Sequence, residues 1–250
     1  MAEPQEQAAP SARTVSLLLS VVAGYVDSCT FLGLFGLFVA QLTGSFVAAG
    51  AQIARGEKGV LLTMFAIPIF LLAGAVTTLL VQLAHHRRSS PFAWSLALEG
   101  TLLTGFFLAG VTGSPFGGLD SPLAVSAGAF GLSAMGVQSA LVQLLMRGTP
   151  STNVMTTNTT QIAILATRTA LCWHAQRRTT DPEAAVQLAT TSERLTAVLL
   201  VAVGFLLGTI AGALAYSAFD LWCLLAPMAA ILGLLVWSPQ SPPQGSPPAR

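Results

Sequence analysis

Asp27 is the residue with the clearest chemical potential, because it lies inside a long apolar segment near the start of the chain. A carboxylate at membrane depth costs at least about 2.5–3.5 kcal/mol, so it normally faces a bundle interior, pairs, or is neutralised. No Lys or Arg inside an apolar segment is available to neutralise it. We therefore predict that Asp27 binds a cation or carries a proton. The alternative is an acid that locks helix packing against Gln138, Tyr25 or a threonine.

Two short, threonine-containing segments, 41–55 (QLTGSFVAAGAQIAR) and 152–168 (TNVMTTNTTQIAILATR), could complete a binding site around Asp27. Irregular backbone at membrane depth must be buried in protein or line a wet cavity. If the two segments meet near the midplane, their polar groups could replace the hydration shell of a small solute. The candidate residues of these segments are Thr43, Gly44, Ser45, Thr156, Thr157 and Asn158, and Tyr25 and Gln138 join Asp27 as candidates from the apolar spans. The alternative is a pair of surface helices whose polar residues serve as N-caps.

Two further polar residues lie within apolar segments. Glu99 is a secondary candidate, and its distance from the segment start predicts that it still reaches interfacial water. Gln138 is expected to form interhelical hydrogen bonds, each worth about 1 kcal/mol. Its position in an internal repeat, opposite Asp27, gives it additional weight as a site residue.

The composition indicates an integral membrane protein. The chain has 250 residues, of which 53% are hydrophobic and 8% charged, whereas a soluble domain carries about 25% charged residues. The mean hydropathy is +0.71. The three scattered cysteines predict neither a zinc site nor a disulfide framework, and no basic patch suggests nucleic acid. There is no H-E-x-x-H, G-x-S-x-G or phosphate-binding glycine motif, so we expect no enzyme activity and no cofactor.

Hydropathy predicts an all-α protein with six crossings of about 20 residues each. The expected spans are 14–38, 59–84, 91–111, 122–146, 195–217 and 219–237. They form one membrane domain over 14–237. The flanking segments 1–13 and 238–250 are rich in Pro, Gln, Ala and Ser, and are predicted to be disordered tails.

The distribution of basic residues favours six crossings over eight, with 41–55 and 152–168 left as non-crossing segments. With both termini inside, nine Lys or Arg residues fall on the cytoplasmic side and two, Arg55 and Lys58, on the other. This asymmetry follows the positive-inside rule.

The two halves of the chain, 14–111 and 122–237, resemble each other weakly. The matching positions are Gly24, Thr43 and Arg55 in the first half and Gly136, Thr156 and Arg168 in the second. Three spans per half place the copies in opposite orientations, which is the inverted repeat common among transporters.

A stripe of small residues, Gly204, Gly208 and Gly212, permits close approach of another helix. Packing within the same bundle is the preferred interpretation. A homodimer through this stripe is the alternative.

The run from Gly24 to Gly56 resembles the opening of the YoaK-like family of bacterial six-span membrane proteins. Its G-Y-x-D motif is matched by Gly24, Tyr25 and Asp27, and its F-x-x-x-x-T-G-N motif by Phe38, Thr43 and Gly44. Ser45 replaces the asparagine of that second motif. A later A-M-G-x-Q-N-A segment is matched at Ala134, Met135, Gly136, Gln138 and Ala140, with Ser139 in place of asparagine. The resemblance covers about 15–237 and implies a location in the bacterial cytoplasmic membrane, but no established activity.

Two functions fit these observations. The first is a small secondary transporter or permease for a small polar or ionic solute, with Asp27 at its centre. The second is a non-transporting membrane scaffold that modulates a partner protein. A wet cavity that reaches Asp27 would favour the first, and a fully packed interior the second.

Overall fold

The computed structural model describes residues 12–56, 60–118, 120–177 and 182–237, which contain helices and no strand. The elements are α1 (Ala12–Gly33), α2 (Leu42–Arg55), α3 (Val60–His86), α4 (Pro91–Gly113), α5 (Pro122–Leu145), α6 (Met155–Gln176), α7 (Pro182–Phe219), the 3-10 helix η1 (Asp220–Leu224) and α8 (Leu225–Trp237). The all-α prediction is confirmed. The predicted tails lie outside the described residues, except that Ala12 and Arg13 begin α1.

Five described segments are long and apolar enough to cross a membrane. They are Ala12–Gly33, Thr63–His86, Pro91–Gly113, Pro122–Leu145 and Glu183–Trp237. The last has 55 residues and contains two predicted spans. The chain turns between them at Asp220, whose φ is 49°, and α8 then packs beside α1 and α4. The predicted spans 195–217 and 219–237 therefore belong to one continuous segment, one before and one after this turn.

Several predicted boundaries are wrong by a few residues or more. α1 ends at Gly33 rather than at 38, because the backbone turns through positive φ angles at Phe35 and Gly36. α7 begins at Pro182 rather than at 195. Its first turns carry charged residues, which lower the hydropathy without preventing a helix, so hydropathy located the apolar part of α7 but not its start.

Serine and proline define the starts of two central helices. Ser90 precedes Pro91 and accepts a hydrogen bond from the N–H of Ala93 at 3.3 Å. Ser121 precedes Pro122 and accepts from Ala124 at 3.2 Å. Each serine satisfies one free N–H of the first turn, and the missing N–H of the following proline is not needed there.

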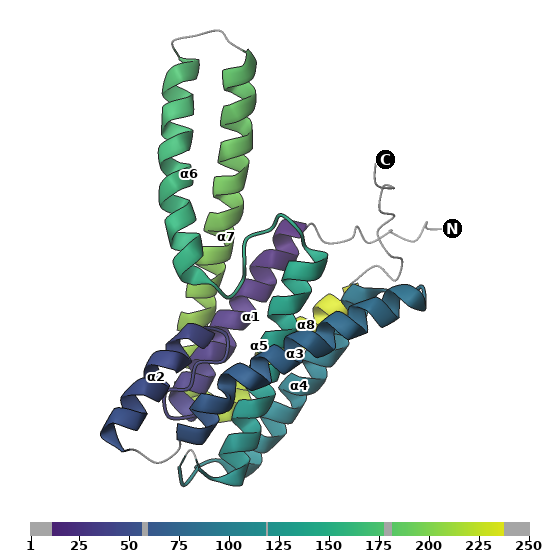
Figure 1. Ribbon diagram of the computed structural model, residues 1–250, viewed down its shortest axis with the longest axis vertical. Helices are drawn as coiled ribbons and strands as arrows, with labels where there is room; N and C mark the ends of the chain where they lie inside the picture. The colour runs from purple at the N-terminus through teal and green to yellow at the C-terminus, as the bar shows by residue number, and fades with distance from the viewer. Residues whose placement is uncertain (1–11, 57–59, 119, 178–181, 238–250) are drawn as a thin grey trace.

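The helices form a bundle with two appendages (Figure 1). α1 and α5 are its central elements. In the apolar stretch of each helix, 72% of the residues are buried in α1 and 67% in α5, against 22% in the outer helix α3. α2 packs on α3 at one side. α6 and the first half of α7 form a hairpin that extends beyond the bundle (Figure 1).

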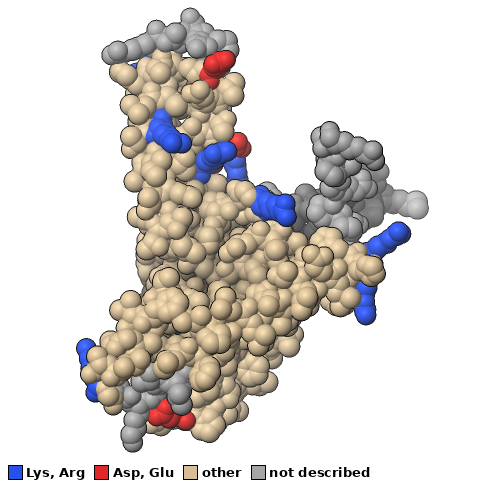
Figure 2. Space-filling view, in the orientation of Figure 1, with Lys and Arg blue, Asp and Glu red and all other residues tan. Residues whose placement is uncertain are grey.

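On the outer surface, charged side chains avoid the middle of the face shown in Figure 2. On the face shown in Figure 2, most blue side chains lie on the hairpin and near the end of α3, and one lies on α2. The surface between them is uncharged on this face. This pattern matches an apolar belt with polar ends, as expected for a bundle in a bilayer.

The tightest helix contact joins α1 to α7 through the small-residue stripe. A Cβ atom at Gly204, Gly208 or Gly212 would meet α1, at Leu17, at the backbone of Val21 or at the backbone of Tyr25, respectively. Packing within the bundle is therefore confirmed for this stripe. The homodimer through these three glycines is wrong, because α1 already occupies the surface.

We expect Gly208→Ala to lower the thermal midpoint of the purified protein, because the added methyl group would meet the Val21 backbone, which cannot move aside. Overpacking of this kind costs about 1–3 kcal/mol. Gly74→Ala in α3 is the matched control, since its Cβ position has no heavy atom within 4 Å apart from the nearby backbone of α3 itself. Equal midpoints for the two variants would contradict this account of the α1–α7 contact.

Candidate functional site

The Asp27 side chain holds a loop that folds back into the bundle. Residues 34–41 leave the end of α1 and return along it before α2 begins. Oδ1 of Asp27 accepts hydrogen bonds from the backbone N–H groups of Val39 and Ala40, both at 2.8 Å. Asp27 is 4% exposed. The carboxylate thus provides the acceptor that buried backbone amides require.

Local sequence explains why this loop can turn back. Gly36 has a φ of 84°, which glycine adopts without steric cost. Leu34 and Leu37 anchor the loop in the core, with 0% and 2% exposure. Ser45, in the first turn of α2, donates its hydroxyl to the carbonyl of Phe38 at 2.8 Å. The loop and the start of α2 are therefore fixed to each other and to α1.

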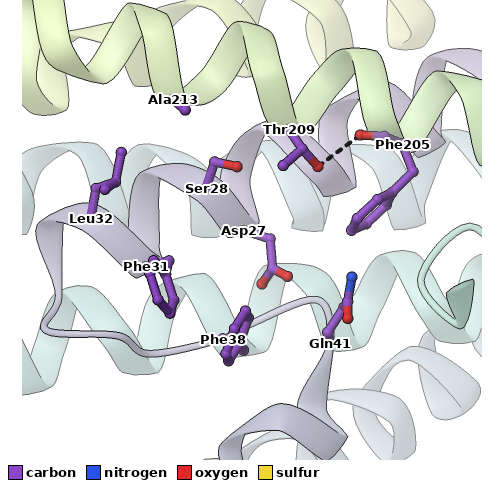
Figure 3. Close-up of a pocket in the computed structure, with 9 residues that line it drawn as sticks. All are labelled: Asp27, Ser28, Phe31, Leu32, Phe38, Gln41, Phe205, Thr209 and Ala213. Atoms are coloured by element: carbon purple, nitrogen blue, oxygen red, sulfur yellow. Dashed lines mark hydrogen bonds between the residues drawn. The ribbon is translucent and has the colours of Figure 1, made fainter. Parts of the chain in front are cut away.

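A cavity of about 240 Å³ adjoins the Asp27 side chain. Its lining comes from α1, the returning loop and α7 (Figure 3): Asp27, Ser28, Phe31, Leu32, Phe38, Gln41, Phe205, Thr209 and Ala213. Asp27 is the only charged residue among them. Figure 3 shows the Asp27 and Gln41 side chains projecting toward each other from α1 and from the loop.

Three phenyl rings surround the polar groups of this cavity. Phe31 and Phe38 lie with their ring centroids 5.0 Å apart. The third, Phe205, is contributed by α7 and is 7% exposed. Its carbonyl accepts the Thr209 hydroxyl at 2.8 Å. The cavity thus places a single carboxylate beside three aromatic rings, and aromatic rings can attract cations.

Gln138 on α5 forms a second polar centre with another returning loop. Its Nε2 donates to the carbonyl of Leu19 on α1 at 2.9 Å, and to Oγ1 of Thr152 at 3.2 Å and Oδ1 of Asn153 at 3.4 Å. Asn158, in the first turn of α6, donates to the carbonyl of Ser151 at 2.7 Å. The expected interhelical bond of Gln138 is thus present, and it also fixes the segment that leads into α6.

The two threonine-containing segments do not meet. Among the described residues α2 and α6 make no contact, and each follows a loop held by its own polar centre. Thr43, Thr156 and Thr157 are exposed, and Gly44 is half-buried. Ser45 and Asn158 are buried, and each donates a hydrogen bond to the loop that precedes its own helix. The prediction that these residues gather at one midplane site is wrong. Asp27 and Gln138 fix the two loops separately, so no single site forms.

Two other candidates lie away from the Asp27 cavity. The hydroxyl of Tyr25 donates to the carbonyl of Cys223 at 3.0 Å, so this side chain joins α1 to η1. Glu99 is 0% exposed, so the expectation that it reaches interfacial water is wrong. Neither carboxylate oxygen of Glu99 has a hydrogen-bond partner among the described residues.

Sequence reasoning missed several residues of the cavity. Gln41 comes from the returning loop. Phe205 and Thr209 come from α7, more than 160 positions away from Asp27 in the chain. No periodicity or spacing links them to Asp27. Phe38 could have been identified from the sequence, because it begins the F-x-x-x-x-T-G motif.

Within the described part of the chain, no group of three or more His, Cys, Asp or Glu side chains could hold a metal ion.

The fold and these two polar centres define a multi-span α-helical membrane protein with a buried carboxylate beside a cavity. Residues 15–237 match the family described as protein of unknown function (DUF1275), and the chain belongs to this family. The resemblance to the YoaK-like membrane proteins is thereby confirmed. Among curated proteins and among solved structures, no match to the chain was found.

We expect Asp27→Leu to destabilise the loop 34–41 far more than Asp27→Asn. Leucine would leave the N–H groups of Val39 and Ala40 buried without an acceptor, at about 1–3 kcal/mol each, whereas asparagine keeps a carbonyl oxygen. Hydrogen exchange followed by mass spectrometry should show faster exchange of the peptide containing these amides in Asp27→Leu. Equal protection in both variants would show that Asp27 does not hold the loop.

Proposed function

We propose that this protein is a small secondary transporter or permease whose solute is a small organic cation bound at Asp27. The observation that carries the proposal is the cavity itself. A buried carboxylate, fixed by two backbone N–H groups, borders a 240 Å³ space lined by three phenyl rings. A fully packed interior would have favoured a purely structural role for this acid.

The lining selects for charge and shape together. Asp27 is the only charged group at the cavity, so it favours a cation over an anion or a neutral solute. Aromatic faces attract cations by about 0.5–2 kcal/mol each, more when the cation is desolvated. Ser28 and Gln41 add polar groups that can orient a substituted ammonium ion. An alkylammonium ion meets these conditions better than a strongly hydrated metal ion.

Equivalent close contacts in both halves support an inverted repeat. A Cβ atom at Gly24 of α1 would meet the carbonyl of Phe205 on α7, and one at Gly136 of α5 would meet the carbonyl of Phe70 on α3. Both phenylalanines begin similar runs, FLLAG from Phe70 and FLLGT from Phe205. Each half therefore packs its first helix onto the third helix of the other half, α1 onto α7 and α5 onto α3, the interlocked arrangement that an inverted repeat would produce.

Six crossings are consistent with the helix dimensions. α8 has 13 residues and η1 has 5, which together span about 30 Å at 1.5 and 2.0 Å per residue. In this scheme α1, α3, α4, α5, the second half of α7, and η1 with α8 cross the membrane, while α2 and α6 do not. The basic residues then favour both termini in the cytoplasm, and we propose that the protein lies in the bacterial cytoplasmic membrane.

We propose that the protein has no enzymatic role.

The alternative of a non-transporting scaffold is supported by one observation, the α6–α7 hairpin that extends beyond the bundle (Figure 1). Leu171, Trp173 and Val186 on this hairpin are exposed and could contact a partner protein. The scaffold function does not require the cavity at Asp27.

We expect the purified protein in liposomes to take up radiolabelled methylammonium or tetramethylammonium faster than protein-free liposomes. Asp27→Asn should reduce this uptake at least tenfold, because it removes the only charge of the cavity. The matched control is Asp120→Asn, which changes an exposed aspartate in the α4–α5 connection and should leave uptake unchanged. Uptake equal to that of empty liposomes, with the protein correctly folded, would favour the scaffold.

The orientation of the halves can be tested by cysteine labelling in intact cells, in a Cys172→Ser background. Thr43 and Thr156 are exposed at the starts of α2 and α6, so both accept cysteine without repacking. We expect a membrane-impermeant maleimide to label Thr43→Cys from outside and Thr156→Cys only in inverted vesicles. Labelling of both from one side would exclude the inverted repeat.

A further inference from the structure

Glu99 is the second buried carboxyl group of the bundle, and its surroundings differ from those of Asp27. It is 0% exposed, and neither Oε atom has a partner among the described residues. An unpaired carboxylate in an apolar interior is far more costly to bury than its neutral acid. Glu99 therefore requires either a proton or a ligand that supplies positive charge.

The packing of α4 on α5 places Glu99 level with Gln138. These helices run antiparallel, and a Cβ atom at Gly131 of α5 would lie 3.7 Å from the ring of Phe106 on α4. Glu99 comes seven residues before Phe106, and Gln138 seven residues after Gly131. Seven residues are two helical turns to within about 20°, so both side chains return to the same interface at the same height.

The amide of Gln138 is oriented with its oxygen unoccupied. Nε2 faces the acceptors on Leu19, Thr152 and Asn153, which determines which end of the amide carries the nitrogen. Oε1 is buried and has no donor among the described residues. An unoccupied acceptor on α5 thus lies at the level of an unoccupied carboxyl group on α4. A single hydrogen between them would satisfy both.

We propose that Glu99 and Gln138 form an intramembrane proton site, in which the neutral Glu99 carboxyl group donates its O–H to Oε1 of Gln138. Release converts Glu99 to its carboxylate and passes one proton to water; only an O–H bond breaks, and rebinding reverses it. The polar residues Thr152 and Asn153 belong to the α5–α6 loop and extend the polar contacts of Gln138 into that loop. This proton exchanges for the cation bound at Asp27, and that coupling role rests on the proposed function.

The elements around α4 offer no competing counter-charge near Glu99. α5 and α8 contain no titratable side chain. The titratable residues of α3 are His85 and His86 in its last turn. Those of η1 are Asp220 and Cys223, and Asp220 accepts a hydrogen bond from Ser114 at the opposite end of α4. Protonation is thus the direct way to neutralise Glu99.

Infrared spectroscopy of the full chain in lipid nanodiscs at neutral pH tests the proton site without any transport assay. We expect a carboxylic acid C=O band that shifts when the protein is labelled with carboxyl-¹³C glutamate, which leaves the band of any aspartic acid unmoved. The band should disappear in Glu99→Gln and persist in Glu193→Gln, a matched change at an exposed residue paired with Arg13. Gln138→Leu should shift it to higher frequency, because the acceptor is lost.

Absence of a glutamate-derived band in the wild type would overturn the proposal, even if Glu99→Gln failed to fold. A band that persists in folded Glu99→Gln would overturn it equally. For the coupling role, a proton gradient should raise methylammonium accumulation in liposomes, and Glu99→Gln should reduce that gain at least tenfold while exchange at equilibrium continues. A glutamate band without any methylammonium uptake would refute the cation transporter and the coupling but leave the proton site standing.

Discussion

Backbone hydrogen bonding in a medium without water is the constraint on which this structure depends. A chain that leaves a helix and returns into the bundle exposes N–H and C=O groups that lipid cannot satisfy. The loop after α1 meets this requirement through Oδ1 of Asp27, which accepts from Val39 and Ala40. The loop after α5 is secured by Gln138 through Thr152 and Asn153. These two polar side chains allow non-helical chain to exist inside a largely apolar bundle.

Close helix packing supplies the rigidity that such loops need. The glycines of α7 bring its backbone against that of α1, and Gly136 does the same between α5 and α3. Helices in lipid gain little from hydrophobic burial, so dispersion contacts at this range make a large contribution to their association. The same contact sets Phe205 and Thr209 opposite Asp27. Packing of α1 on α7 therefore builds the cavity as well as the bundle.

The two buried carboxyl groups of the bundle lie in different surroundings. Asp27 receives two N–H donors and borders a cavity, which offsets part of the cost of a charge and leaves room for a cation. Glu99 receives no donor and has no exposed surface, which favours the neutral acid. When two acids of one protein lie in such different surroundings, those surroundings give them different protonation behaviour.

The amino-acid sequence by itself determined the membrane class, the helical content and the importance of Asp27 and Gln138, because apolar length and a rare buried polar residue are local signals. It also determined the starts of α4 and α5 through Ser90 and Ser121, whose caps need only a few adjacent residues. Only the tertiary structure decided that Gly208 faces α1, that α2 and α6 remain apart, and that Phe205 joins Asp27 at one cavity. Those features depend on the angle and register between helices far apart in the chain, which no local pattern encodes.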